Sequence, residues 1–204
     1  MRERLLDAAT AIAAEHGFET SALRDIAARA GVSPAMVAYY FGDRRGLYEA
    51  MFERAFERLG EQVATLLDDG ESASDTLDGF VRLHVAALAA DPWIPQLIAR
   101  EVLSRETPLR ARFAEQVGAG PLAMLVAWIE GQQRAGALRG DLDARLVAIS
   151  LAGLAAFPFL IVPILGERIG LRLDDALSEQ LIEHNQKLLA TGLRAPQDGS
   201  EGTS

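Results

Sequence analysis

Apolar residues recur every three or four positions along almost the whole chain, which is the spacing of helices that bury one face. No stretch alternates between apolar and polar residues in the way a half-buried strand does. The pattern predicts helices over residues 2–16, 22–30, 34–41, 44–67, 74–90, 93–104, 122–136, 143–165 and 174–189, with a further, interrupted helix over 105–120. With residues 105–136 counted as one interrupted helix, we therefore expect an all-α protein of about nine helices.

Turn-forming residues divide this pattern. Ser21 precedes the second helix and Ser33 the third, where a hydroxyl can accept a hydrogen bond from the first helical turn. Pro34 suits the first position of the third helix, because the N–H it lacks has no helical partner there. Asp43 is expected to cap the fourth helix. The polar stretch over residues 68–75 predicts a linker.

Residues 23–41, LRDIAARAGVSPAMVAYYF, carry the most specific pattern. Small Ala27 allows two short helices to approach closely, and Gly31, four residues later, tolerates the angles of a sharp turn. Val37, ten residues after Ala27, returns to the core from the second of these helices. These offsets are typical of a helix-turn-helix. A generic helical hairpin is the alternative that this pattern alone leaves open.

The flanking residues make the pattern more specific. The stretch from Leu5 to Phe56 resembles the N-terminal domain of TetR-type bacterial transcriptional regulators. The similarity rests on the leading helix LLDAATAIAAEHGFET and on LRDIAARAGVSPAMVAYYFGDRRGLYEAMF, in this order and spacing. Two positions depart from the family pattern: Ala38 stands where Tyr or Asn is frequent, and Arg44 where Lys is usual.

The resemblance implies that residues 34–40 form a recognition helix for the major groove of DNA. Arg24 is the candidate for a bidentate guanine contact, although a surface ion pair is its alternative role. The apolar Pro34, Ala35 and Met36 are expected to pack against base edges. The candidates for phosphate contacts are Ser21, Ser33, Tyr39, Tyr40 and Arg44. Core packing is the alternative role for either tyrosine.

Charge argues against nucleic acid at first sight, since the chain has a net charge of −9. Residues 1–54, however, hold seven arginines against eight acidic side chains, so the negative charge lies mainly beyond them. Salt screens charges more than about 8 Å apart under physiological conditions. We therefore expect DNA binding that weakens strongly as salt increases.

The larger remainder of the chain is expected to form a helical domain for ligand binding and dimerisation. Residues 146–165 are twenty uncharged residues, and a helix of this kind is difficult for a single compact subunit to bury on all sides. Pairing this helix and the last one with their copies creates a four-helix interface. The candidate interface residues are Leu151, Leu154, Phe159, Leu177, Leu181, His184 and Leu188. A membrane span is the alternative, which Pro158 and Pro163 and the small residues of the segment disfavour.

Aromatic residues of the middle helices are candidates for a ligand pocket, although each is also a candidate for the core. They are Phe80, His84, Trp93, Phe113, Trp128 and Phe157, with Phe159 as a further possibility. Pocket walls are mostly apolar, so a mostly apolar ligand is expected. The chain has no cysteine and three histidines, so neither a metal site nor another cofactor is expected.

Together these features predict three regions: a DNA-binding domain over 1–54, a ligand-binding and dimerisation domain over 55–194, and a disordered tail over 195–204. The expected protein is a homodimeric repressor, released from a pseudo-palindromic operator by a small ligand. We expect it in the cytoplasm, bound to the nucleoid when on DNA, because its start lacks the features of a secretory signal. An enzyme and a protein-interaction module are weaker alternatives, as no catalytic motif is present.

Overall fold

The computed structural model describes residues 1–16, 22–68, 72–103 and 107–193, and the regular elements in these ranges are ten α-helices and one π-helical segment. In chain order the α-helices are α1 (Arg2–His16), α2 (Leu23–Arg29), α3 (Pro34–Phe41), α4 (Arg44–Asp68), α5 (Ala73–Ala90), α6 (Trp93–Leu97), α7 (Pro108–Ala119), α8 (Pro121–Arg134), α9 (Ala144–Ile169) and α10 (Asp175–Leu193). The π-helical segment Ile98–Leu103 continues α6. The all-α prediction is confirmed.

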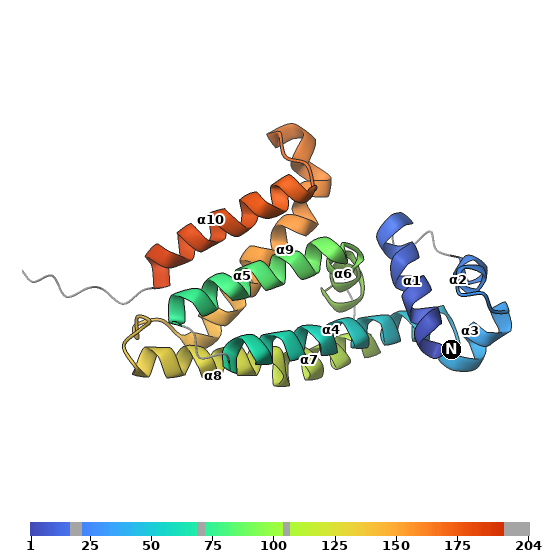
Figure 1. Ribbon diagram of the computed structural model, residues 1–204, viewed down its shortest axis with the longest axis horizontal. Helices are drawn as coiled ribbons and strands as arrows, with labels where there is room; N and C mark the ends of the chain where they lie inside the picture. Colours follow the sequence, from blue (N-terminus) through green and yellow to red (C-terminus); the bar gives the residue numbers. More distant parts are fainter. Residues whose placement is uncertain (17–21, 69–71, 104–106, 194–204) are drawn as a thin grey trace, which may run out of the picture.

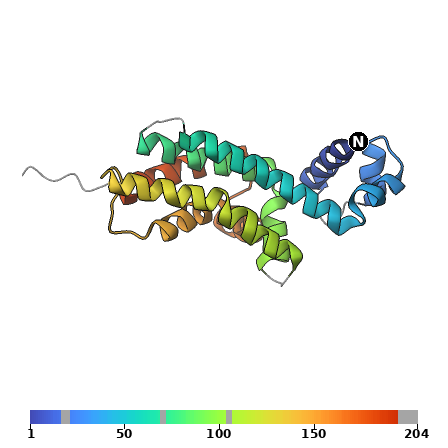
Figure 2. The same ribbon diagram turned by 90° about the horizontal axis from the view of Figure 1, so that it is seen from below.

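The molecule is elongated, with α1, α2 and α3 at one end and the remaining helices in a larger body (Figure 1). The long helix α4 joins the two parts: α1 and α3 of the first part and α5, α7 and α8 of the larger body all pack against it. Figure 2 shows α8 running alongside α4 on the lower side of this body. The predicted domain boundary at residue 54 therefore falls inside one continuous helix.

Polar residues begin several helices as expected. The Asp43 carboxylate accepts a hydrogen bond from the Gly46 amide at 2.8 Å, and Asp143 accepts one from the Arg145 amide at 2.9 Å. The linker before α5 is shorter than predicted, because the hydroxyl of Ser72 accepts a hydrogen bond from the Asp75 amide and α5 begins at Ala73.

Gly120 divides the segment that was predicted as an interrupted helix into α7 and α8. A Cβ atom at this position would lie 2.4 Å from the carbonyl oxygen of Gln116, so a side chain does not fit. Pro121 then occupies the first turn of α8. Pro108 likewise begins α7, whereas Gly118 lies inside that helix without ending it.

The helix α9 is longer than predicted and continues through both Pro158 and Pro163 to Ile169. Each proline removes one backbone hydrogen bond, and burial of residues such as Ala155 and Val162 along the helix offsets that cost. It is also the one helix in the described ranges that is long and apolar enough to cross a membrane, with a mean hydropathy of 2.3. It packs on α5 and α8, as a core helix of a bundle does.

Candidate nucleic-acid interface

The two short helices α2 and α3 pack through the residues that the sequence pattern selects. Ile26, Ala27 and Val37 have no exposed surface. Gly31 adopts a positive φ of 67°, and the amide of Val32 donates a hydrogen bond to the carbonyl of Ala27 at 2.9 Å. The backbone conformation of Gly31 and the hydrogen bond from Val32 thus stabilise the turn between the helices. The prediction of a helix-turn-helix geometry is confirmed.

Helices α1 and α4 fix this pair in position. The guanidinium of Arg4 on α1 donates a hydrogen bond to the carbonyl of Ala30, at the end of α2, at 2.6 Å. Arg54 on α4 donates hydrogen bonds to the Asp7 carboxylate at 2.6 Å and to the Thr10 hydroxyl at 3.0 Å. With the packing of α3 against α2 and α4, the four helices therefore form one unit.

Several acidic groups of this unit are already neutralised by arginines. Glu15 accepts two hydrogen bonds from the guanidinium of Arg29, at 2.6 and 2.7 Å. This ion pair raises the pKa of Arg29 above its usual value, chiefly through the hydrogen bonds with Glu15. Glu3 and Asp7 share Arg54 in the same way. The acidic residues therefore oppose a phosphate backbone less than their number implies.

The start of α3 is open to solvent. Ser33, Pro34 and Ala35 are exposed, whereas Met36 is half-buried against the core. Ser33 occupies the N-cap position and Pro34 the first turn, as predicted, but the Ser33 side chain makes no capping hydrogen bond. Its hydroxyl is therefore not engaged by the helix that it precedes.

The polar candidates around α3 are also exposed. The side chain of Arg24 is 83% exposed and lies 3.8 Å from Asp25, which is a weak surface ion pair. Tyr39 is 78% exposed and Tyr40 36%, so neither belongs to the core, and their rings meet edge to face at 5.0 Å. Ser21 lies outside the described residues, and the residue preceding α2 is Ala22, which has no capping side chain.

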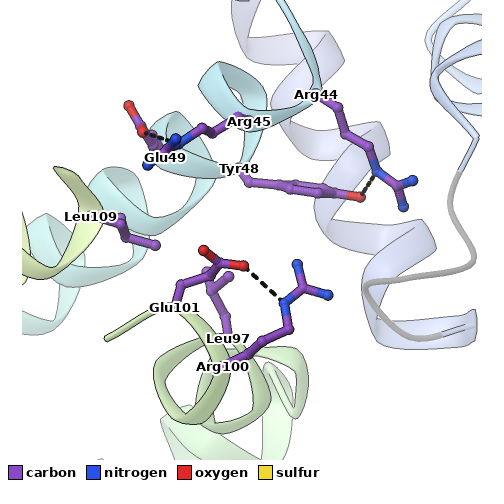
Figure 3. Close-up of a pocket in the computed structure, with 8 residues that line it drawn as sticks. All are labelled: Arg44, Arg45, Tyr48, Glu49, Leu97, Arg100, Glu101 and Leu109. Carbon is purple, nitrogen blue, oxygen red and sulfur yellow. Dashed lines mark hydrogen bonds and ion pairs between the residues drawn. The ribbon is translucent and has the colours of Figure 1, made fainter. Parts of the chain in front are cut away.

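Arg44 differs from the other candidates because its side chain contacts a residue of its own helix. Its Nε donates a hydrogen bond to the Tyr48 hydroxyl, and its guanidinium lies 5.2 Å from the centre of the Tyr48 ring. In this position Arg44 lines a cavity of about 510 Å³ between α4 and the segment that contains α6 (Figure 3). The cavity is lined by Arg44, Arg45, Tyr48, Glu49, Leu97, Arg100, Glu101 and Leu109.

None of the six residues that were predicted to line a ligand pocket is among the lining residues of this cavity. Phe80 and Trp93 are buried, and Phe113 packs against Phe52 and Phe56 at ring distances of 5.9 and 5.7 Å. Trp128 is half-buried, and Phe157 is 60% exposed on α9.

His84 stacks on Phe80 with ring centres 5.5 Å apart. Its burial lowers the pKa of the imidazole to about 4. The ring is therefore neutral at physiological pH.

Sequence reasoning missed the cavity because its residues come from four separate elements. One signal was present: Arg100 and Glu101 are two adjacent charges inside the apolar run WIPQLIAREVL. Charges inside such a run are expected at a solvent-lined surface, since burying them without a partner is costly.

The surface of α9 also differs from the prediction in detail. Leu151, Phe159 and Leu177 are buried within the subunit, so they offer little surface to a second copy. Leu154 and Leu181 are half-buried, and His184 and Leu188 are exposed on α10. The large apolar side chains that α9 exposes are Leu146, Ile149, Phe157, Ile164, Leu165 and Ile169. Because α9 is apolar on all sides, its periodicity did not distinguish the inner face from the outer one.

Comparison with known proteins places the N-terminal unit in a family. Residues 5–51 match the family model described as bacterial regulatory proteins, tetR family. The HTH-type transcriptional regulator BetI of Serratia proteamaculans (strain 568) is 40% identical over 62 residues, which are 30% of this chain and 31% of BetI. The chain thus matches about a third of the length of these curated relatives.

Solved structures resemble the chain over nearly its whole length. FadR from Bacillus subtilis, in complex with stearoyl-CoA, superposes with a TM-score of 0.70 at 21% identity, covering 90% of this chain and 96% of FadR. AibR, in complex with isovaleryl coenzyme A and operator DNA, has a TM-score of 0.69 at 16% identity, covering 92% and 96%. At these identities the likeness establishes the fold.

Proposed function

The chain belongs to the TetR family of bacterial regulatory proteins, and on this premise we propose that it is a sequence-specific transcriptional regulator, a homodimeric repressor released from its operator by a small ligand. The observation that carries the proposal is that the first turn of α3 is exposed, whereas Val37 of the same helix is buried and anchors it. Helix α3 lies at one end of the molecule (Figure 1). We place the protein in the cytoplasm, on the nucleoid when bound to DNA, and assign it no catalytic activity.

In the proposed complex α3 enters the major groove. Pro34, Ala35 and Met36 contact base edges by van der Waals packing, which includes the methyl groups of thymines. The exposed Arg24 reaches a guanine with two hydrogen bonds. The phosphate contacts come from Ser21, Ser33, Tyr39, Tyr40 and Arg44, and those contacts set the position of the domain without reading sequence.

A single domain of this kind makes few base contacts, so the proposal includes a two-fold dimer that reads two half-sites. The apolar side chains exposed on α9, with Leu154 on the same helix, support an interface with a second copy. Leu181, His184 and Leu188 extend this surface onto α10. Large apolar side chains that are exposed on one helix are typical of an interaction site when they lie close together.

The proposed ligand is small and mostly apolar. FadR, which shares the fold, has been solved with stearoyl-CoA, a ligand with a long apolar chain. Ligand and DNA favour different arrangements of the two α3 helices. By linkage, DNA then weakens ligand binding by the same factor as ligand weakens DNA binding.

Selection of bound duplexes from a random pool with the purified protein tests the proposal. We expect enrichment of a pseudo-palindrome whose half-sites lie about one helical turn (~34 Å) apart. Binding of the enriched duplex should fall by orders of magnitude between about 50 and 200 mM salt if about six phosphates are contacted. Absence of enrichment, or binding that is insensitive to salt, would contradict the proposal.

Two variants identify the surface that binds the selected duplex. Arg24→Ala and Tyr39→Ala remove exposed side chains, so they should weaken binding while the helical content stays unchanged. Arg58→Ala, an exposed position farther along α4, is the matched control and should bind like the wild type. Equal binding by all three variants would place the DNA elsewhere.

A further inference from the structure

The cavity between α4 and the α6 segment lies where the two parts of the molecule meet. Arg44 and Tyr48 belong to the first turns of α4, which hold the DNA-binding unit, and Arg100 belongs to the π-helical segment of the larger body. Figure 3 shows the guanidinium groups of Arg44 and Arg100 on opposite sides of the space next to the Tyr48 hydroxyl. A ligand in this space contacts both parts at once.

The lining of the cavity has an excess of positive charge. Three guanidinium groups, of Arg44, Arg45 and Arg100, face two carboxylates, of Glu49 and Glu101. Guanidinium groups bind phosphate with paired hydrogen bonds in a planar geometry, and such charge-assisted bonds are among the strongest in proteins. The chemistry of the lining therefore favours an anionic ligand over a cationic one.

Two of these arginines pair with acidic neighbours through guanidinium groups that are about half exposed. Arg100 pairs with its neighbour Glu101 at 2.9 Å, and Arg45 with Glu49 at 3.2 Å, whereas the two carboxylates are only 25% and 16% exposed. The guanidinium groups therefore keep surface that a further anion can reach. A doubly charged phosphate group that offers three acceptor oxygens competes well with such partners.

The backbone that carries Arg100 is also unusual. Residues 98–103 form a π-helix, a geometry that is rare and frequent at functional sites. The hydroxyl of Thr107 donates a hydrogen bond to the carbonyl of Glu101 at 2.7 Å and so satisfies one acceptor of this segment. The π-helical turn thus holds Arg100 and Glu101 at the edge of the cavity.

We propose that this cavity binds the phosphate-bearing end of a regulatory ligand and that the bound phosphate holds Arg44 away from DNA. The proposal rests on the function proposed above, because it names the chemistry and the action of the ligand. The sequence resemblance assigns Arg44 a contact with a DNA phosphate. The same guanidinium lies over Tyr48 and lines the cavity. A DNA phosphate and the phosphate of the ligand therefore compete for this side chain.

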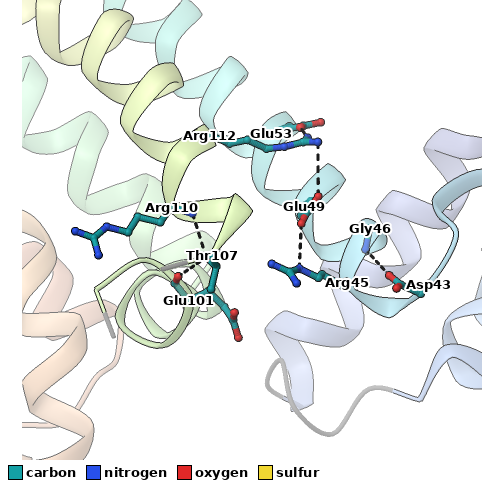
Figure 4. A network of polar contacts seen from close by, with 9 residues as sticks. All are labelled: Asp43, Arg45, Gly46, Glu49, Glu53, Glu101, Thr107, Arg110 and Arg112. Carbon is teal, nitrogen blue, oxygen red and sulfur yellow. Dashed lines mark hydrogen bonds and ion pairs between the residues drawn. The ribbon is translucent and has the colours of Figure 1, made fainter. Parts of the chain in front are cut away.

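Calorimetric titration of the full-length protein with inorganic pyrophosphate, without DNA and at constant ionic strength, tests the site. Arg100→Gln removes one cation that is not among the proposed DNA contacts, so it should weaken pyrophosphate binding about 10-fold or more. Arg110→Gln is the matched control on α7, where the side chain points away from the cavity (Figure 4), and should bind as the wild type does. No binding by the wild type, or equal binding by Arg100→Gln, would overturn the proposal.

A parallel titration with coenzyme A distinguishes the source of the phosphate. Tighter binding of coenzyme A than of pyrophosphate, lost in Arg100→Gln, identifies an organic diphosphate as the ligand. Equal binding of the two identifies the inorganic ion. In either case the site is supported, whereas coenzyme A binding that survives Arg100→Gln would place the ligand elsewhere and overturn the proposal.

The effect on DNA is tested with the selected duplex. A saturating ligand should reduce the slope of log affinity against log salt by about 0.9 for each Arg44 that leaves a phosphate. In Arg44→Gln the slope should be lower from the start and unaffected by the ligand. An unchanged slope in the wild type would reject the competition. If pyrophosphate binds as expected but no duplex is ever selected, the proposed function fails while the phosphate site stands.

Discussion

Arg112 on α7 forms an ion pair with Glu53 on α4, and a second oxygen contact of 3.7 Å joins the same guanidinium to Glu49 (Figure 4). Glu49 in turn pairs with Arg45, at the first turn of α4. This chain of charges connects the larger body to the helix on which the DNA-binding unit is built. These contacts join α7 to the beginning of α4, next to α3.

We expect Arg112→Ala to loosen the DNA-binding unit with little effect on stability. The pair is partly exposed, so its loss should change the free energy of unfolding by at most about 1 kcal/mol. Because the chain has no cysteine, a spin label at Ala28→Cys reports the distance between the two copies of α2 in the dimer. A broader distance distribution in Arg112→Ala supports this role, and Arg110→Ala is the control. Identical distributions would exclude it.

Ile26→Ala tests the packing of α2 against α3. Ile26 is fully buried, and removing a buried isoleucine side chain to the β-carbon costs about 2–5 kcal/mol, because a cavity remains. Denaturation with urea should show this loss, together with loss of DNA binding. The exposed Ala28→Ser serves as the control. A loss below 1 kcal/mol would mean that α2 and α3 are not packed as described.

The helix-turn-helix was predictable because its geometry depends on a few small or β-branched residues at fixed offsets. Ala27, Gly31 and Val37 each have one role that other side chains fill poorly, so the sequence pattern alone located the turn and both helices. The direction of Arg44 was not predictable in this way. It depends on Tyr48 and on a cavity whose other side, at Arg100, is more than fifty residues away in sequence.

The inner and outer faces of α9 could not be separated for a related reason. An amphipathic helix shows its buried face by its period, but α9 is apolar all round. Leu151 and Phe159 face the core and Phe157 faces out, and only the packing of α5 and α8 decides between them. The sequence thus predicted that α9 pairs with a second copy of the chain, and the structure shows which of its apolar side chains are exposed.

Phe157→Glu should separate the proposed dimer into monomers. A carboxylate on this exposed apolar surface of α9 must be desolvated when a second copy covers it, and that cost opposes association. Sedimentation equilibrium measures the change. Leu103→Glu is the matched control, since Leu103 is also exposed and apolar but lies outside α9. A dimer that persists in Phe157→Glu, or a wild type that is monomeric, would rule out this interface.

His84 should make the stability of the protein depend on pH. Burial lowers its pKa in the folded state to about 4, below the value of about 6.5 expected when unfolded, so the unfolded state binds the extra proton first as the pH falls. The free energy of unfolding should therefore decrease from pH 6.5 to pH 4, by at most about 3 kcal/mol from this group. The limit is an upper one because His84 retains some exposed surface.

Urea denaturation at pH 7 and at pH 4.5 measures this dependence. In His84→Leu the difference between the two pH values should be smaller than in the wild type, because the group that takes up the proton is gone. His184→Leu, at an exposed position on α10, is the control. An unchanged pH dependence in His84→Leu would show that the imidazole is not desolvated.

Photo-cross-linking from α3 tests the central claim most directly. A photoreactive probe on Ala35→Cys can be attached cleanly, since the chain has no other thiol, and Ala86→Cys on α5 is the control. With the selected duplex, the probe at position 35 should cross-link to bases at two symmetric positions about one helical turn apart, and the probe at position 86 to none. Full DNA binding without any cross-link from position 35 would contradict the entry of α3 into the major groove.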